Sequence, residues 1–139
     1  MPKSQYVDPG KSFDAATRDG MQVMSVAEAA KAADIIHILL PDEMHGTVYT
    51  NEIKAGLTAG KTLSCSHGFA YAFDVINPPA DVDVIMAAPK SPGTEVRRRF
   101  VEGFGVPGLI SVHQNVSGNA RNIALGMAKA LGLTRAGVL

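Results

Sequence analysis

Three apolar runs in this chain each end in residues that can bind or react with a ligand, and this pattern constrains the fold more than any other. The runs cover residues 35–40, 62–66 and 82–88. They are followed by Pro41-Asp42-Glu43, by His67-Gly68-Phe69 and by Pro89-Lys90-Ser91-Pro92-Gly93. In an open α/β sheet the ligand crevice lies beyond the carboxyl ends of the parallel strands. We therefore expect the three loops to face one ligand.

Helix signals alternate with these runs. Ser12 stands as a helix-cap residue before a short helical stretch, and Ser25 and Glu28 have the spacing of a capping box. We expect helices over 13–18, 26–33, 42–57, 71–76, 94–102 and 119–131, and strands over 21–24, 34–40, 62–66, 82–87 and 109–113. This alternation predicts an α/β fold with a doubly wound, mainly parallel sheet and helices on both faces. The nearly continuous apolar run at 34–40 predicts a strand buried on both sheet faces.

Composition excludes several classes of partner. The 139 residues suit one domain, thirteen basic and thirteen acidic side chains cancel, and no basic block is longer than Arg97-Arg98-Arg99. We therefore expect no nucleic-acid partner and no anionic membrane surface. Cys65 is the single cysteine, and the chain has neither an N-terminal apolar segment nor an apolar stretch near the ~20 residues that span a bilayer. A cytoplasmic location is the expectation.

Several segments, read in order from Gly10 to Leu139, carry a resemblance to a known family. They are Val26-Ala27-Glu28-Ala29-Ala30, Leu39-Leu40-Pro41-Asp42-Glu43, Ser66-His67-Gly68-Phe69, 78–86, Ala88-Pro89-Lys90 with Pro92-Gly93, Glu102-Gly103 with Gly105-Val106-Pro107, and Arg135-Ala136-Gly137. Together they resemble the NADPH-binding domain of ketol-acid reductoisomerase, also called acetohydroxy-acid isomeroreductase. The resemblance implies a Rossmann-like fold.

The resemblance also implies an activity and its limits. The family carries out a magnesium-dependent alkyl migration on an acetohydroxy acid and then a hydride transfer from NADPH, giving the dihydroxy acids of valine and isoleucine biosynthesis. By this resemblance, residues 1–139 form a partial domain that is incomplete at its N-terminus, because the family's Gly-rich fingerprint follows an earlier strand. The all-helical domain with the magnesium ligands is expected after Leu139. We therefore expect no metal ligand in this chain and no turnover by the chain alone. We also expect a homo-oligomeric enzyme.

The resemblance assigns a catalytic histidine and one cofactor segment. His67 matches the family's active-site histidine, although a histidine at a strand end can also be a structural hydrogen-bonding residue. Asp42, Glu43, Met44 and His45 match the stretch that lies along the cofactor. Without the resemblance they are a helix N-terminus that carries two acids.

Two further cofactor contacts are expected from the same match. Gly93 matches a glycine where the backbone approaches the cofactor, and it also suits a plain turn. Gly10, Lys11 and Ser12 match the loop that reads the adenosine ribose, where a lysine and a hydroxyl suit a 2′-phosphate. Capping by Ser12 is the competing interpretation. Lys90 is expected to fix its loop or to provide a cation near the substrate, without a catalytic role.

The remaining chemical side chains are expected to be structural. His37 lies within an apolar strand and Cys65 suits a small buried residue, whereas Arg97, Arg98 and Arg99 suit a solvated helix face. His113 has no predicted role beyond family likeness. Two other hypotheses stay open from the sequence: a different NAD(P)-dependent dehydrogenase, or a non-catalytic module that self-associates through exposed apolar surface.

Overall fold

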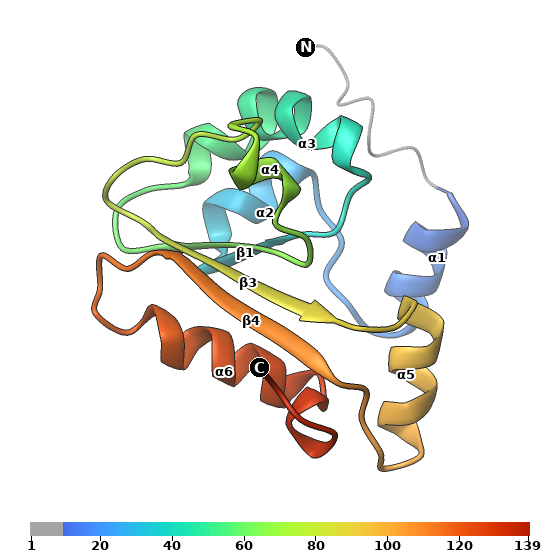
Figure 1. Ribbon diagram of the computed structural model, residues 1–139. Coiled ribbons are helices and arrows are strands. Elements are labelled where there is room, and N and C mark those ends of the chain that lie inside the picture. Colours follow the sequence, from blue (N-terminus) through green and yellow to red (C-terminus); the bar gives the residue numbers. More distant parts are fainter. Residues whose placement is uncertain (1–9) are drawn as a thin grey trace.

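In the computed structural model, which describes residues 10–139, four strands form one sheet with helices on both faces (Figure 1). The strands are β1 (Ile35–Ile38), β2 (Thr62–Cys65), β3 (Asp83–Pro89) and β4 (Gly108–Gln114), and they lie in the order β1-β2-β3-β4. β1, β2 and β3 are parallel to one another, and β4 is antiparallel to β3. The predicted Rossmann-like, mainly parallel α/β fold is confirmed.

The helices of the described residues connect and cover these strands. They are α1 (Lys11–Arg18), α2 (Val26–Ala32), α3 (Asp42–Val48), α4 (Phe69–Ala72), α5 (Gly93–Val101) and α6 (Ala120–Ala130). A π-helical turn (Tyr49–Ile53) and a 3-10 turn (Lys54–Gly56) continue α3, and a second 3-10 turn (Leu133–Arg135) follows α6. α2, α3 and α4 cover one sheet face and α6 covers the other, while α5 lies beyond the carboxyl end of β3 (Figure 1).

The direction of β4 follows from where the chain returns to the sheet. The N–H of Lys90, just after β3, donates a hydrogen bond to the carbonyl of Pro107 at 2.8 Å. Gly108 therefore starts β4 beside Pro89, at the end of β3. A strand that starts at that edge has to run back along β3, so β4 is antiparallel.

The buried residues form three clusters, and two of them meet at β3 from opposite faces of the sheet. Val84 and Ile85 are neighbours in β3 and both are fully buried, one in each cluster, because successive side chains of a strand point to opposite faces. Ile85 packs against Ala120 and Ala124 of α6. These small side chains let the helix lie close to the strand.

Three local features of the structure differ from the sequence prediction. Residues 21–24 form no strand, and the described residues provide no partner strand for them. α1 starts at Lys11 with Gly10 as its N-cap, so Ser12 is not the cap. The helix expected at 71–76 lies at 69–72 instead. The capping box before α2 is confirmed, because Ser25 Oγ accepts the Glu28 N–H at 3.3 Å and Glu28 accepts the Ser25 N–H at 3.0 Å.

β1 is also more exposed than its apolar sequence predicts. Ile35 is 40% exposed and Leu39, just after the strand, is 69% exposed. The expectation that this strand is buried on both faces is wrong for the described residues, because β1 is an edge strand that pairs only with β2. A groove of about 370 Å³ runs beside it, lined by residues of β1 and α2.

Candidate cofactor site and active site

The parallel strands bring their three loops to one edge of the sheet (Figure 1). α3 begins at Asp42 after β1, His67 follows β2, and α5 begins at Gly93 after β3. Asp42 Oδ2 lies 3.6 Å from His67 Nδ1. Two of the three predicted loops thus meet directly.

His67 is presented to solvent with a defined tautomer. Its side chain is 66% exposed, and Nδ1 accepts a hydrogen bond from the backbone N–H of Phe69 at 3.3 Å. Because that N–H can only donate, the neutral ring carries its proton on Nε2. The Asp42 carboxylate also lies near Nδ1. The neutral ring can therefore donate a hydrogen bond from Nε2.

A pocket of about 510 Å³ lies at the same edge, a volume typical of ligand sites. Gly93 lines it, and a Cβ added at Gly93 would meet no atom within 4 Å, so this backbone faces open space. The other lining residues comprise four polar side chains and a largely apolar wall: His37, Ser66, Ser91, Arg97, Leu39, Pro89, Val96, Phe100, Ala130 and Leu131. No lining residue is acidic.

The four predicted cofactor residues at the start of α3 have different surroundings in the structure. The His45 side chain is only 3% exposed, and its Nε2 donates to the carbonyl of Leu40 at 2.8 Å. Met44 packs against the core, and Glu43 is exposed. Asp42 contacts another predicted site residue, His67. The cofactor roles of all four residues stay predictions.

The ribose loop lies apart from the pocket lining. Gly10, Lys11 and Ser12 are exposed at the start of α1, and none of the three lines the pocket. Their predicted contact with an adenosine 2′-phosphate is therefore not supported by proximity to the pocket, and it stays a prediction.

Of the pocket-lining residues, sequence reasoning assigned a cofactor role only to Gly93, and it gave His37 and Arg97 other roles. His37, predicted to be a core residue, is hydrogen-bonded through Nδ1 to Ser64 Oγ at 2.9 Å and also lines the pocket. Burial lowers the pKa of the His37 imidazole. Arg97, predicted to be part of a solvated face, lines the pocket as well. Residues four apart share a helix face, so the spacing of Gly93 and Arg97 could have indicated this.

Comparison with known proteins identifies the family. A family model described as the acetohydroxy acid isomeroreductase NADPH-binding domain matches residues 5–137. The chain belongs to this family. A ketol-acid reductoisomerase (NADP(+)) from Akkermansia muciniphila is 77% identical over 133 residues, which cover 96% of this chain and 41% of that protein. The chain thus spans about two fifths of this relative's length.

Solved structures agree with this assignment. An NADH-preferring ketol-acid reductoisomerase from an uncultured archean superposes with a TM-score of 0.93 at 51% identity, over 98% of this chain and 41% of that one. Pyrroline carboxylate reductase from Plasmodium falciparum, solved with NADP bound, gives a TM-score of 0.62 at 16% identity, over 100% of this chain and 44% of that one. The second likeness shows the fold alone.

The acetohydroxy acid isomeroreductase domain contains one G-x-G-x-x-G spacing, but in the wrong context for a dinucleotide fingerprint. Gly103, Gly105 and Gly108 lie between α5 and β4, whereas the fingerprint leads from a strand into a helix. A Cβ at Gly105 would collide with the carbonyl oxygen of Gly132. This glycine therefore permits a close backbone contact with the turn after α6, which is a packing role.

Two more side chains of this family member support the loop that carries His67. Cys65 is fully buried, as predicted, and its Sγ lies 3.0 Å from the hydroxyl of Tyr71. Burial raises the pKa of both groups. The Tyr71 ring stacks on His113, with centroids 5.5 Å apart and planes inclined by 17°. His113 therefore has a structural contact that the sequence did not reveal.

Residues 10–139 contain neither a metal centre nor a membrane-spanning helix. No three His, Cys, Asp or Glu side chains of that range are grouped so as to hold a metal ion. No helix in it is long and apolar enough to cross a membrane.

Proposed function

We propose that this chain binds the NADPH of a ketol-acid reductoisomerase and contributes one wall of its active site. The reaction is the reduction of 2-acetolactate or 2-aceto-2-hydroxybutyrate, after alkyl migration, to the dihydroxy acids of valine and isoleucine biosynthesis. The observation that carries the proposal is the convergence of the three strand-end loops beside a pocket without acidic lining, in a chain of this family. A pocket lined by donors suits a phosphate-bearing ligand.

The residues present fit such a cofactor in part. Gly93 offers backbone that faces the open pocket, and the segment Asp42 to His45 provides the beginning of α3 at the same edge. Gly10, Lys11 and Ser12 are proposed to bind the 2′-phosphate, which requires the cofactor to extend to the start of α1. NADPH, when bound, supplies a hydride to the substrate.

His67 is proposed as the catalytic residue of this chain. In the neutral tautomer set by the Phe69 N–H, its Nε2–H donates a hydrogen bond to a substrate oxygen and polarises the adjacent carbon. The carboxylate of Asp42 lies 3.6 Å from Nδ1 and is proposed to help orient the ring.

The magnesium ligands of the enzyme are proposed to lie outside this chain, in the all-helical domain that the family resemblance implies. We propose that the alkyl-migration step requires those ligands and therefore takes place only with another part of the enzyme present. The chain alone then has no turnover. The enzyme is proposed to be a cytoplasmic homo-oligomer without a nucleic-acid or membrane partner.

Binding titrations monitored by nicotinamide fluorescence test the proposal. One relative is named for NADP(+) and another is described as NADH-preferring, so both reduced cofactors have to be compared. We expect saturable NADPH binding, roughly tenfold tighter than NADH binding for one charge-assisted contact to the 2′-phosphate. Lys11→Gln should weaken the binding of NADPH and leave that of NADH unchanged.

Three results would each contradict a part of the proposal. Absence of saturable binding of either cofactor would remove the cofactor role, and equal affinities would remove the role of Lys11 and Ser12. Conversion of 2-acetolactate by the chain alone, with magnesium and NADPH present, would show that the expected inactivity is wrong.

A further inference from the structure

Arg97 differs from the two arginines that follow it. Arg98 pairs with Glu95 at 2.8 Å and with Glu102 at 3.1 Å, and Arg99 pairs with Glu95 at 2.8 Å. Among the described residues, Arg97 takes part in no ion pair. The carboxylates of α5 therefore compensate Arg98 and Arg99 and leave the charge of Arg97 available.

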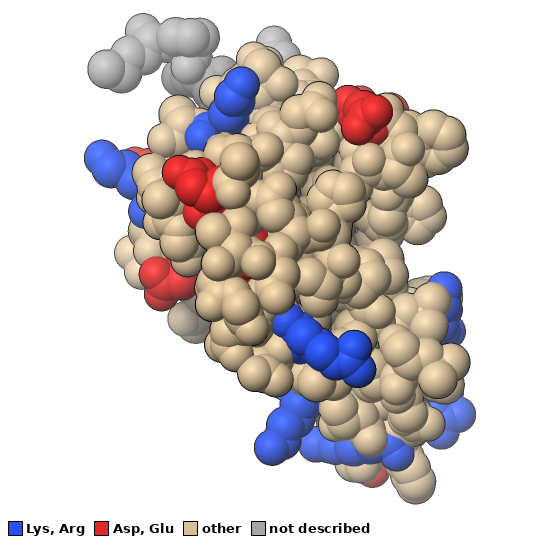
Figure 2. All heavy atoms as spheres, turned by 60° about the vertical axis from the view of Figure 1, so that its left-hand side comes forward, with Lys and Arg blue, Asp and Glu red and all other residues tan. Residues whose placement is uncertain are grey.

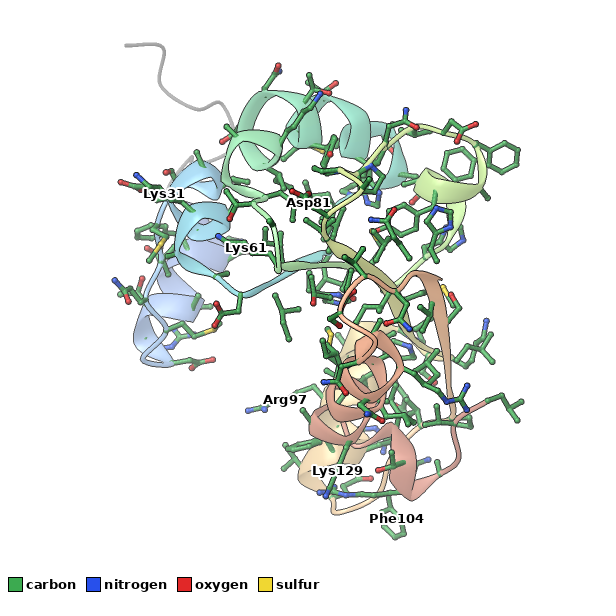
Figure 3. All side chains as sticks on the ribbon, turned by 90° about the vertical axis from the view of Figure 1, so that its left-hand side faces the viewer. Lys31, Lys61, Asp81, Arg97, Phe104 and Lys129 are labelled. Carbon is green, nitrogen blue, oxygen red and sulfur yellow. The ribbon has the colours of Figure 1, made fainter. Side chains whose placement is uncertain are left out.

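Arg97 also points to a different place. It lines the pocket together with Gly93, which lies one helical turn earlier on α5. Figure 3 shows its side chain extending from α5 into the space between the part of the chain with α1 and α2 and the part with α5 and α6. In Figure 2 basic side chains gather on the lower part of the visible face, whereas acidic ones lie mainly on its upper part. The charge of Arg97 thus faces the pocket.

The other polar groups of the pocket are also hydrogen-bond donors. Ser66 and Ser91 contribute hydroxyl groups. The backbone N–H groups of Gly93 and Thr94 precede the first hydrogen bonds of α5, which run from Glu95 and Val96 to the carbonyl of Pro92. N–H groups at this position have no partner within their helix. With no carboxylate in the lining, the pocket favours an anion.

We propose that Arg97 binds a phosphate group of the dinucleotide in this pocket; this rests on the proposed function and adds a residue that the family resemblance did not assign. The guanidinium group presents a planar pair of donors that matches two phosphate oxygens. Leu39, Val96 and Phe100 form the apolar part of the lining beside those donors. Because the chain has no net charge, this local cation supplies attraction that the whole molecule does not.

Three variants of α5 test the assignment. Arg97→Gln removes the charge and the donor pair, and Arg97→Lys keeps the charge alone. Arg98→Gln is the matched control, because it changes the net charge equally on the same helix but removes an arginine that already has two carboxylate partners. Dissociation constants for NADPH and for inorganic pyrophosphate would be measured by calorimetry, with amide NMR shifts of Gly93 and Thr94 as a second readout.

Arg97→Gln should weaken NADPH binding roughly tenfold or more, the loss expected for a charge-assisted contact. Arg97→Lys should fall between this variant and the parent, and Arg98→Gln should stay within about twofold of the parent because its charge is already compensated. Raising the salt concentration should weaken binding to the parent more than binding to Arg97→Gln. Circular dichroism would verify that each variant is folded.

The outcomes separate this inference from the proposed function. If NADPH binds and Arg97→Gln behaves like Arg98→Gln, the inference is wrong and the proposed function stands. If NADPH fails to bind but pyrophosphate shifts the Gly93 and Thr94 amides only when Arg97 is present, Arg97 binds anions, but its assignment to a dinucleotide phosphate and the proposed function are both wrong. If neither ligand binds, both are wrong. Equal weakening by Arg97→Gln and Arg98→Gln also refutes a direct contact.

Discussion

Asp83 provides the most direct test of how the loop between β4 and α6 is held. The residue is only 3% exposed, yet its carboxylate accepts three hydrogen bonds from that loop. Oδ1 accepts the N–H groups of Val116 at 2.7 Å and Ser117 at 2.9 Å, and Oδ2 accepts the Ser117 hydroxyl. Burial alone would raise the pKa of Asp83, but the bonds from Ser117 and Val116 hold this pKa below its ordinary value.

The loss of folding free energy on removing these bonds depends on whether the N–H and O–H donors can bind water instead. Val116 and Ser117 are exposed, so water can replace the carboxylate at each donor. We therefore expect about 1 kcal/mol per bond, the ordinary net contribution of a hydrogen bond rather than the larger one of a bond to a charged group, and about 3 kcal/mol for Asp83→Ala. For a domain of this size that corresponds to a fall in melting temperature of roughly 10 °C. Asp83→Asn keeps the shape and one acceptor oxygen, but its NH2 group cannot accept the Ser117 hydroxyl. It should cost about half as much, because the two bonds to Oδ1 can remain without charge assistance.

Thermal and urea unfolding at a series of pH values provide the assay. A lowered folded-state pKa gives stability that is present above the unfolded-state value, about pH 4, and is lost as pH falls through the folded-state value. The difference between the parent and Asp83→Asn should therefore be constant near neutral pH and shrink below about pH 4. Asp81→Asn, an exposed neighbour labelled in Figure 3, is the control. A difference that is absent at pH 7, or that grows in acid, would refute the reasoning.

Two other substitutions and one chemical modification test packing. Gly56→Ala should destabilise the chain by at least about 2 kcal/mol, because the added Cβ would lie 2.8 Å from the backbone nitrogen of Lys31, whereas Gly126→Ala in α6 meets no atom within 4 Å and should stabilise it by about 1 kcal/mol in urea unfolding. Cys65 should resist a thiol reagent at pH 8 until the chain unfolds, because the residue is fully buried and burial raises the pKa of its thiol; rapid labelling of the native chain would contradict its placement.

The sequence predicted the fold well where the pattern is local or repeated. The apolar runs that end at Asp42, His67 and Gly93 form the three parallel strands, and the capping box before α2 is present. These features depend on residues close together in the chain. Strand 21–24, by contrast, depends on a partner strand, and the described residues contain none. An apolar run alone cannot reveal whether its strand lies at the centre or at the edge of a sheet.

The candidate site was predicted in outline, and its side-chain directions were not. The sequence placed Asp42 and His67 at one edge, and the structure brings them within 3.6 Å. It could not show that His45 turns into the core, because position within a helix's first turn does not fix which face is buried. Arg97 was hidden by its neighbours: three consecutive arginines look alike until their carboxylate partners are known.

The side chains of Val84 and Ile85 point to opposite faces of β3, and this couples the stabilities of the core clusters on the two faces of the sheet. Each residue is fully buried in a different cluster, yet a single peptide bond connects them. Neither cluster can therefore open without disturbing the strand on which the other depends. A destabilising substitution in the core on the α6 face of the sheet should accordingly raise the fraction of molecules in which the loop that carries His67 is also unfolded. We therefore expect the sheet and both of its helical layers to unfold as one cooperative unit. The ordering of the proposed catalytic edge then depends on the stability of the whole domain.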